Sequence, residues 1–191
     1  PGVREKAAQI CKTTGGRLLE VGCGDGLFLL PLAKASKLRL VGLDVFDPTF
    51  EEAKRRVREQ KIGNVSLVKG KAQSLPYREG AFDTVVCINT LNSLQSKAEV
   101  AGAIAEMGRI CKQEGCLILD FRNEKNPWMR YRFKWRKDRF PESKLPQLTF
   151  SDREMRDMLA AAGFEVKQKH AIGLPIARWA PALVIRATRP R

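Results

Sequence analysis

An acidic residue and three glycines on alternate positions stand near the N-terminus, where a short apolar run ends. Glu20 is followed by Gly22, Gly24 and Gly26. Glycine accepts positive φ and lets atoms of another molecule approach the backbone, and the N–H groups that open a following helix favour electron-rich groups. The spacing therefore predicts a turn between a strand and a helix that binds a nucleotide-like ligand.

The positions of the glycines discriminate between two classes of ligand. The dinucleotide fingerprint is G-x-G-x-x-G, whose third glycine allows close packing of helix on strand. Gly22 and Gly24 match its first two positions, but Leu27 occupies the third, and the last glycine stands one residue earlier. A nicotinamide-dependent oxidoreductase is disfavoured for this reason. The E-x-G-x-G-x-G pattern instead resembles motif I of the class I S-adenosylmethionine-dependent methyltransferases.

A second acidic residue ends the next apolar run, residues 38–44. A carboxylate at the end of the second strand of a βαβ unit can accept hydrogen bonds from both hydroxyls of a ribose. We expect Asp44 to hold the ribose, with Val45 beside it in the cofactor site. The alternative is a loop aspartate that caps the following helix, a role that Asp47 or Thr49 could fill equally well. The order of the elements favours the ribose.

Two further stretches match the family in its order. Residues 65–77 are similar to its third strand and adenine-side loop, except that Lys71 replaces the usual aspartate. The resemblance therefore implies backbone contacts near Ala72 on the adenine side. Residues 82–91 resemble the F-D-x-V strand, whose end lies beside the methionine part of the cofactor, and this implies the same place for Asn89.

The C-terminal half continues the match. Residues 106–119 are similar to the family's helix, glycine turn and fifth strand, and residues 161–166 to the end of its last helix and its sixth strand. The resemblance covers residues 17–121 and 149–188. It implies S-adenosylmethionine as the cofactor, with Glu20 and the three glycines around the methionine part, and it says almost nothing about the acceptor.

The elements that position these residues are strand-length apolar runs that alternate with helical patterns, which predicts a parallel, doubly wound sheet. We expect an α/β, Rossmann-like fold with seven mostly parallel strands and an antiparallel last strand at 182–188. At 191 residues the chain is long enough for one domain, so we predict a single class I methyltransferase domain over residues 1–191. No apolar run approaches the ~20 residues of a membrane span.

The net charge of +14 is more than an enzyme of free small molecules needs. A basic surface concentrates anionic partners, whether nucleic acid, acidic lipid or a phosphorylated metabolite, and speeds their encounter. The five cysteines stand at irregular positions, and the chain has one histidine. This composition suits reduced thiols in a cytoplasmic protein rather than a disulfide framework, and we expect no metal site.

A basic and aromatic segment at about residues 122–148 interrupts the family pattern between the fifth strand and the last helix. In this family that connection often contributes to the substrate pocket. Residues 122–139 hold eight Lys or Arg against two acids, so they supply six of the fourteen net positive charges. Five large apolar side chains lie among these charges: Trp128, Met129, Tyr131, Phe133 and Trp135.

The start of this segment carries a helix signal. Asn126 and Pro127 are typical of an N-cap followed by a first helical position. On that helix one face would hold Trp128, Tyr131 and Trp135, and the opposite side Arg130, Lys134 and Lys137, which describes a basic amphipathic helix. On a strand, basic and aromatic residues from 130 to 136 would alternate instead. The cap favours the helix.

Three functions suit the segment. It could close as a lid over the cofactor pocket while its charges stay in water. It could lie on an anionic membrane and present the active site to a lipid-linked acceptor, since its aromatic and basic residues separate by face. It could also bind single-stranded RNA through phosphate contacts and base stacking. The separation by face ranks the membrane ahead of RNA.

No residue is securely identified as a catalytic base. A hydroxyl acceptor would usually need one. The two candidates are His170, the only histidine, which follows the expected sixth strand at 164–169, and Asp120, which ends the fifth. Asn92 and Ser93 stand where many small-molecule members of the family carry histidines, which removes one common source of a base.

The resemblance thus implies a methyltransferase whose acceptor is an unidentified small molecule, either anionic or lipid-linked, in the cytoplasm or at the surface of a membrane. The alternative is a protein that keeps the fold, has lost catalysis and binds RNA or acidic lipid. Lys71 and the basic segment could support that alternative. The glycine turn and Asp44 argue against it, because a binding-only domain would have no need of them.

Overall fold

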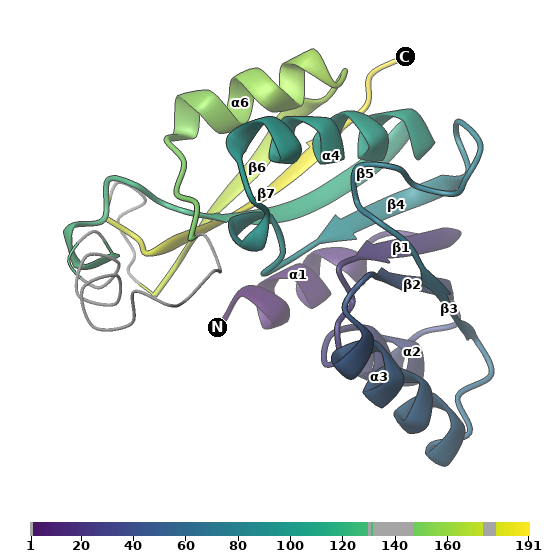
Figure 1. Cartoon of the computed structure of the whole chain (residues 1–191). Coiled ribbons are helices and arrows are strands. Elements are labelled where there is room, and N and C mark those ends of the chain that lie inside the picture. The colour runs from purple at the N-terminus through teal and green to yellow at the C-terminus, as the bar shows by residue number, and fades with distance from the viewer. Residues whose placement is uncertain (1, 130, 132–146, 174–178) are drawn as a thin grey trace.

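A seven-stranded sheet with the order β3-β2-β1-β4-β5-β7-β6 forms the centre of the molecule in a computed structural model (Figure 1). The structure describes residues 2–129, 131, 147–173 and 179–191. The strands are β1 (Arg17–Val21), β2 (Arg39–Asp44), β3 (Val65–Lys69), β4 (Phe82–Cys87), β5 (Cys111–Arg122), β6 (Glu165–Ile172) and β7 (Ala182–Thr188). The helices are α1 (Val3–Cys11), α2 (Leu29–Ala35), α3 (Asp47–Glu59), α4 (Lys97–Ile110) and α6 (Asp152–Ala161), with a short 3₁₀ helix η1 (Leu91–Ser93).

The directions of the strands confirm the predicted α/β fold. The pairs β3–β2, β2–β1, β1–β4 and β4–β5 are parallel, whereas β7 is antiparallel to both of its neighbours. The bounds of β7, Ala182–Thr188, are those predicted for the antiparallel last strand. β6 extends to Ile172, three residues beyond the expected end of the sixth strand. His170 therefore lies inside a strand rather than after it.

Helices cover both faces of the sheet, as a doubly wound fold requires (Figure 1). On one face α4 and α6 pack on the strands through buried residues such as Ile104 and Leu159. On the other face α1 and α2 pack through residues such as Ile10 and Leu29, and α3 lies beside α2 (Figure 1). The site must therefore lie where helices leave the sheet open, at the carboxyl ends of the parallel strands.

Two predicted boundaries differ from the structure. The helical pattern that follows Asp44 in the sequence predicts a helix from Phe50 to about Lys61, whereas α3 begins at Asp47, because Pro48 in the first turn has the fixed φ that a helix needs. The glycine turn expected between the fourth helix and the fifth strand lies inside β5, where the pairing register with β4 shifts between Phe82 and Thr84. Gly115 is required there, since a Cβ would lie 2.6 Å from the Sγ of Cys111.

Candidate functional site

The three glycines after β1 form the predicted turn, and all three have positive φ: +78° at Gly22, +51° at Gly24 and +80° at Gly26. At Gly22 a Cβ would lie 2.2 Å from Oγ1 of Thr90, so packing alone demands glycine. At Gly24 no described protein atom lies within 4 Å of the position a Cβ would take. Gly22 thus lets Thr90, which follows β4, approach the turn, and Gly24 leaves its backbone open to a ligand.

Backbone hydrogen bonds fix the turn to the end of β2. The N–H groups of Gly22 and Cys23 donate to the carbonyl of Leu43 at 2.7 and 3.0 Å. The N–H of Gly24 donates to Oδ2 of Asp44 at 2.7 Å. The glycine turn and the carboxylate expected to hold the ribose are therefore parts of one structure.

Asp44 has less capacity for a ribose than expected. Its Oδ1 accepts hydrogen bonds from the N–H groups of Val45 and Phe46 at 2.7 and 2.8 Å, while Oδ2 binds Gly24. An ionised carboxylate offers about four lone-pair positions, and these bonds use three of them. In this arrangement Asp44 organises the turn and can accept one ribose hydroxyl, not two. The N-cap of α3 is Phe46, which provides no side-chain cap.

Glu20 is buried beneath the turn with a relative exposure of 2%. Its Oε2 has no hydrogen-bond partner in the described part of the chain. Burial raises the pKa of this carboxyl well above its usual range, against the opposing field of Arg4 in α1. A carboxyl group with an unused oxygen is a fitting partner for the ammonium group of the methionine part of the cofactor, so Glu20 and the glycines fit the expected ligand.

Asn89, at the end of β4, adopts the left-handed conformation with a φ of +56°. Its N–H donates to Oδ1 of Asp120 at 2.5 Å, and its Oδ1 accepts from Nη2 of Arg122 at 2.9 Å. Arg122 also donates from Nη1 to Oδ2 of Asp120 at 3.1 Å. The three side chains hold one another at the carboxyl ends of β4 and β5, where the expected methyl-transfer position lies.

Asp120 is brought to the site, but not as a free base. Its side chain is almost wholly buried, and both of its oxygens accept hydrogen bonds. Burial raises the pKa of its carboxyl, while Arg122 and the N–H of Asn89 act in the opposite direction. Asp120 is placed to stabilise the strained backbone of Asn89 and to fix the guanidinium of Arg122.

The structure does not bring His170 to these residues. It lies on β6, which β7 and β5 separate from β4. Adjacent strands are about 4.8 Å apart, so the two strands are roughly 14 Å from each other. Burial and the charge of Lys6 lower the pKa of His170, and its Nε2 has no partner in the described part of the chain. It lies opposite Val184 of β7, on the face of the sheet that α1 covers.

Lys71 and Ala72 lie in the loop after β3, beside the end of β2, where Lys69 pairs with Asp44. Ala72 is nearly buried, whereas Lys71 is exposed. Arg109 of α4 fixes the loop by donating to the carbonyls of Leu75 and Tyr77; the two distances are 3.0 and 2.7 Å respectively. The loop is thus held where the adenine side was expected.

Most of the basic segment lies outside the described residues, including the stretch on which the helix and strand alternatives differ. Its start is described and confirms the N-cap: Oδ1 of Asn126 accepts from the N–H of Met129 at 2.6 Å. Trp128 and Tyr131 are exposed, and their ring centroids lie 5.9 Å apart. The Asn126 amide donates to the carbonyl of Trp179, a third exposed aromatic residue, in the loop before β7.

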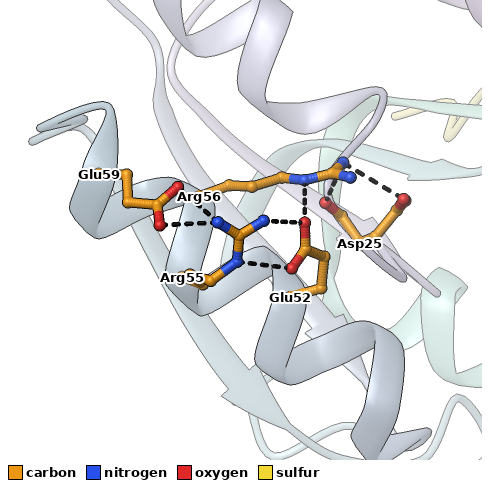
Figure 2. A network of polar contacts seen from close by, with 5 residues as sticks. All are labelled: Asp25, Glu52, Arg55, Arg56 and Glu59. Atoms are coloured by element: carbon orange, nitrogen blue, oxygen red, sulfur yellow. Dashed lines mark hydrogen bonds and ion pairs between the residues drawn. The ribbon is translucent and has the colours of Figure 1, made fainter.

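Sequence reasoning missed the site roles of Thr90, Arg122 and Arg56. Thr90 packs against Gly22, which no spacing rule indicates. Arg122 was counted only as one charge of the basic segment. Arg56, in the last turn of α3, binds the glycine turn (Figure 2). Each of these contacts joins elements distant in sequence, so the only signal was a basic or hydroxyl side chain near a strand end or on a helix.

Comparison with known proteins is consistent with this geometry. Residues 19–119, more than half of the chain, match the family described as "Methyltransferase domain". The chain belongs to this family. The matched region runs from Leu19 in β1 to Leu119 in β5, so it contains the turn, Asp44 and Asn89. The predicted class I methyltransferase resemblance is confirmed.

Two curated relatives and one solved structure illustrate the likeness of this methyltransferase-domain protein. It is 30% identical over 118 residues to demethylmenaquinone methyltransferase of Lactiplantibacillus plantarum, which covers 60% of this chain and 48% of the relative. It is 30% identical over 127 residues to phosphatidylethanolamine N-methyltransferase of Cereibacter sphaeroides, covering 65% of this chain and 60% of the relative. The chain therefore spans about half the length of these relatives.

The solved structure is magnesium protoporphyrin IX methyltransferase of Synechocystis PCC 6803 with bound SAH. Its TM-score is 0.76 at 20% identity, and the alignment covers 97% of this chain and 81% of that one. At this identity the likeness concerns the fold alone. It supports the α/β fold described above.

Among the described residues, no group of three or more His, Cys, Asp or Glu side chains is arranged to hold a metal ion. The described helices likewise include none with the length and apolar character needed to cross a membrane.

Proposed function

We propose that the protein is an S-adenosylmethionine-dependent methyltransferase that transfers the methyl group to a small-molecule acceptor. The observation that carries this proposal is the junction of the glycine turn with Asp44, above the buried carboxyl of Glu20. It combines an open backbone at Gly24, one free acceptor position for a hydroxyl and an unused buried oxygen. A ribose and an ammonium group would use these features together.

The cofactor would supply an electrophilic methyl group on a sulfonium, and the protein would orient the reaction. Methyl transfer is an in-line displacement, so the acceptor atom must stand opposite the sulfur and close to the methyl. Glu20 and the glycine turn would hold the methionine part, Asp44 the ribose, and the loop with Lys71 and Ala72 the adenine. Asn89, locked by Asp120 and Arg122, would border the path to the acceptor.

We propose an anionic or lipid-linked acceptor for this reaction. Arg122 uses two of its five N–H groups within the described part of the chain, on Asp120 and Asn89, and Arg is suited to bind carboxylate or phosphate with the others. The two curated relatives are named for demethylmenaquinone and phosphatidylethanolamine, which are both membrane lipids. Those names support a lipid class and do not select one.

We further propose that the protein works in the cytoplasm, at the surface of an anionic membrane. The exposed aromatic residues Trp128, Tyr131 and Trp179 come from two segments that the hydrogen bond of Asn126 to the Trp179 carbonyl joins. Trp and Tyr rings favour the interface of a bilayer, and basic residues favour anionic headgroups. The segment that begins at Arg122 contributes six net positive charges by sequence.

The test is incubation of the protein with methyl-labelled S-adenosylmethionine and an extract of whole cells, followed by partition into lipid, nucleic-acid and small-molecule fractions. Label in the lipid fraction is the expected result. Label in a water-soluble anion would support the methyltransferase activity and exclude a lipid acceptor. Label in RNA would exclude both the lipid-linked and the anionic small-molecule acceptor. Cofactor binding without any transfer would favour the alternative, a methyltransferase-fold protein that binds RNA or acidic lipid.

A further inference from the structure

α3 packs directly against the glycine turn. A Cβ at Gly26 would lie 3.7 Å from the Cβ of Ala53, in the middle of this helix. One turn further along α3, Arg56 reaches the same loop. Its Nη1 donates to the carbonyl oxygen of Asp25 at 3.1 Å and to Oδ2 of Asp25 at 3.2 Å, as Figure 2 shows.

Asp25 is the residue between two glycines of the turn. Gly24 and Gly26 both have positive φ, and glycine has more conformational freedom to lose than any other residue. A bond to the backbone carbonyl of Asp25 restrains the peptide unit that joins Asp25 to Gly26. Asp44 restrains the other side of the same stretch through the N–H of Gly24. The two bonds together hold the backbone that faces the cofactor.

Arg56 is itself fixed by its neighbours on α3. Its Nε donates to Oε1 of Glu52 at 2.7 Å. Arg55 binds the same carboxylate from the solvent side, with Nη2 at 2.7 Å from Oε1, and also pairs with Glu59 (Figure 2). These bonds from Arg55 and Arg56 lower the pKa of Glu52 to about 2, so its charge persists across the physiological range. The guanidinium of Arg56 is thereby oriented before it meets the turn.

We infer that Arg56 is a positioning residue for the cofactor: it clamps the glycine turn in its binding conformation from α3. The clamp lowers the conformational entropy that cofactor binding must otherwise remove, which is the general effect of preorganisation. This inference rests on the proposed use of S-adenosylmethionine. It assigns to α3 a function beyond packing, because Arg56 holds the turn. The contacts with the cofactor itself belong to other residues.

Arg55 provides a matched control. It has the same charge, neighbours Arg56 in sequence and shares Glu52, yet its bonds in the structure go to Glu52 and Glu59 and not to the turn. Surface ion pairs of this kind contribute little to stability. If loss of the positive charge or of the bond to Glu52 weakened cofactor binding, substitution of either arginine would do so. Loss of the clamp would weaken binding only when Arg56 is substituted.

The experiment compares the affinity of wild type, Arg56→Gln, Arg55→Gln and Arg56→Lys for S-adenosylhomocysteine by calorimetry. We expect Arg56→Gln to raise Kd roughly three- to tenfold, because the two charged hydrogen bonds of Arg56 to Asp25 in the turn are lost at a half-buried site. Arg55→Gln should stay within about twofold, and Arg56→Lys, which can still donate to the Asp25 carbonyl, should recover part of the loss.

Thermal unfolding of the free variants separates positioning from general stability. We expect equal midpoints for Arg55→Gln and Arg56→Gln. Equal Kd values for these two variants would overturn the inference, as would a loss of affinity in Arg56→Gln that matches its loss of stability. Failure of the wild type to bind S-adenosylhomocysteine at all would instead overturn the proposed function, and the inference with it.

Discussion

Asp44 accepts a hydrogen bond from the N–H of Gly24 at 2.7 Å, which joins the end of β2 to the glycine turn that follows β1. The relationship makes one carboxylate serve two purposes. It shapes the turn expected to hold the methionine part of the cofactor, and its three hydrogen bonds leave one of about four acceptor positions for a ribose hydroxyl. Loss of this carboxylate should therefore affect the site in two ways.

Asp44→Ala should weaken binding of S-adenosylhomocysteine by roughly 1–3 kcal/mol, because it leaves a ribose hydroxyl and the N–H of Gly24 without an acceptor. Calorimetry measures this directly. Asp47→Ala is the control, since Asp47 pairs with Lys69 on the exposed surface and does not touch the turn. Unchanged affinity in Asp44→Ala would refute the assignment of Asp44.

Glu20→Gln should stabilise the free protein at neutral pH and weaken the cofactor. Burial raises the pKa of Glu20 above its value in the unfolded chain, so the folded state holds a proton that the unfolded state has released. Stability from this group is complete below the unfolded pKa, near 4.5, and is lost as pH rises toward the folded pKa. Glutamine does not titrate, so the variant should lose less stability between about pH 5 and 8.

Urea unfolding of wild type and Glu20→Gln at about pH 5 and about pH 8 checks this expectation. Binding of S-adenosylhomocysteine should be weaker in the variant, because an amide cannot release a proton and become the charged partner of the ammonium group. A variant with the same pH dependence as the wild type would show that Glu20 does not titrate as inferred.

Asp120→Ala should destabilise the protein by about 2–4 kcal/mol, because the guanidinium of Arg122 and the N–H of Asn89 lose their carboxylate acceptor near the interior. Denaturant titration measures the effect. Asp157→Ala offers the comparison, since Asp157 is exposed and lies 3.9 Å from its partner Arg153. A change below about 0.5 kcal/mol in Asp120→Ala, the size of an ordinary surface substitution, would contradict the anchoring role.

Trp128→Ser and Trp179→Ser should each reduce co-sedimentation with vesicles that contain phosphatidylglycerol. The wild type and both variants should bind weakly to vesicles of phosphatidylcholine alone. Phe46→Ser is the control, because Phe46 is similarly exposed but follows β2, outside the two segments that carry Trp128 and Trp179. Absence of wild-type binding to anionic vesicles would exclude the membrane-surface proposal and leave the lid and RNA interpretations of the segment.

The five thiols should react with Ellman's reagent only after unfolding. All five cysteines are free and buried. Burial raises the pKa of Cys11 and of Cys111 to about 12 and raises the pKa of the other three thiols as well, so the reactive thiolate is scarce at neutral pH. Rapid labelling of any thiol in the native protein would contradict this burial.

Much of the fold was predictable because the signals were local. The glycine spacing placed the turn, the apolar run ending at Asp44 placed β2, and the bounds of β7 were correct. Asn126 as an N-cap was correct for the same reason: a cap depends on neighbours three residues away. Local patterns of this kind indicate backbone conformation, because that conformation depends mainly on residues within the same element.

The contacts that tune the site were not predictable, because they join distant elements. The bonds of Arg122 to Asn89 and of Arg56 to Asp25 span 33 and 31 residues. His170 was a candidate base by being the only histidine, yet its place in the sheet is set by the pairing of β6 with β7 and not by its type. Asp120 was at the right strand end, but only the structure shows that both of its oxygens are engaged.

Calorimetric titration of the wild-type protein with S-adenosylmethionine, and separately with NAD, tests the central claim most directly. The glycine spacing, with Leu27 in place of the third fingerprint glycine, predicts that S-adenosylmethionine binds to one site per chain and that NAD does not bind. Binding of NAD, or binding of neither compound, would contradict the assignment of this site to a methyltransferase cofactor.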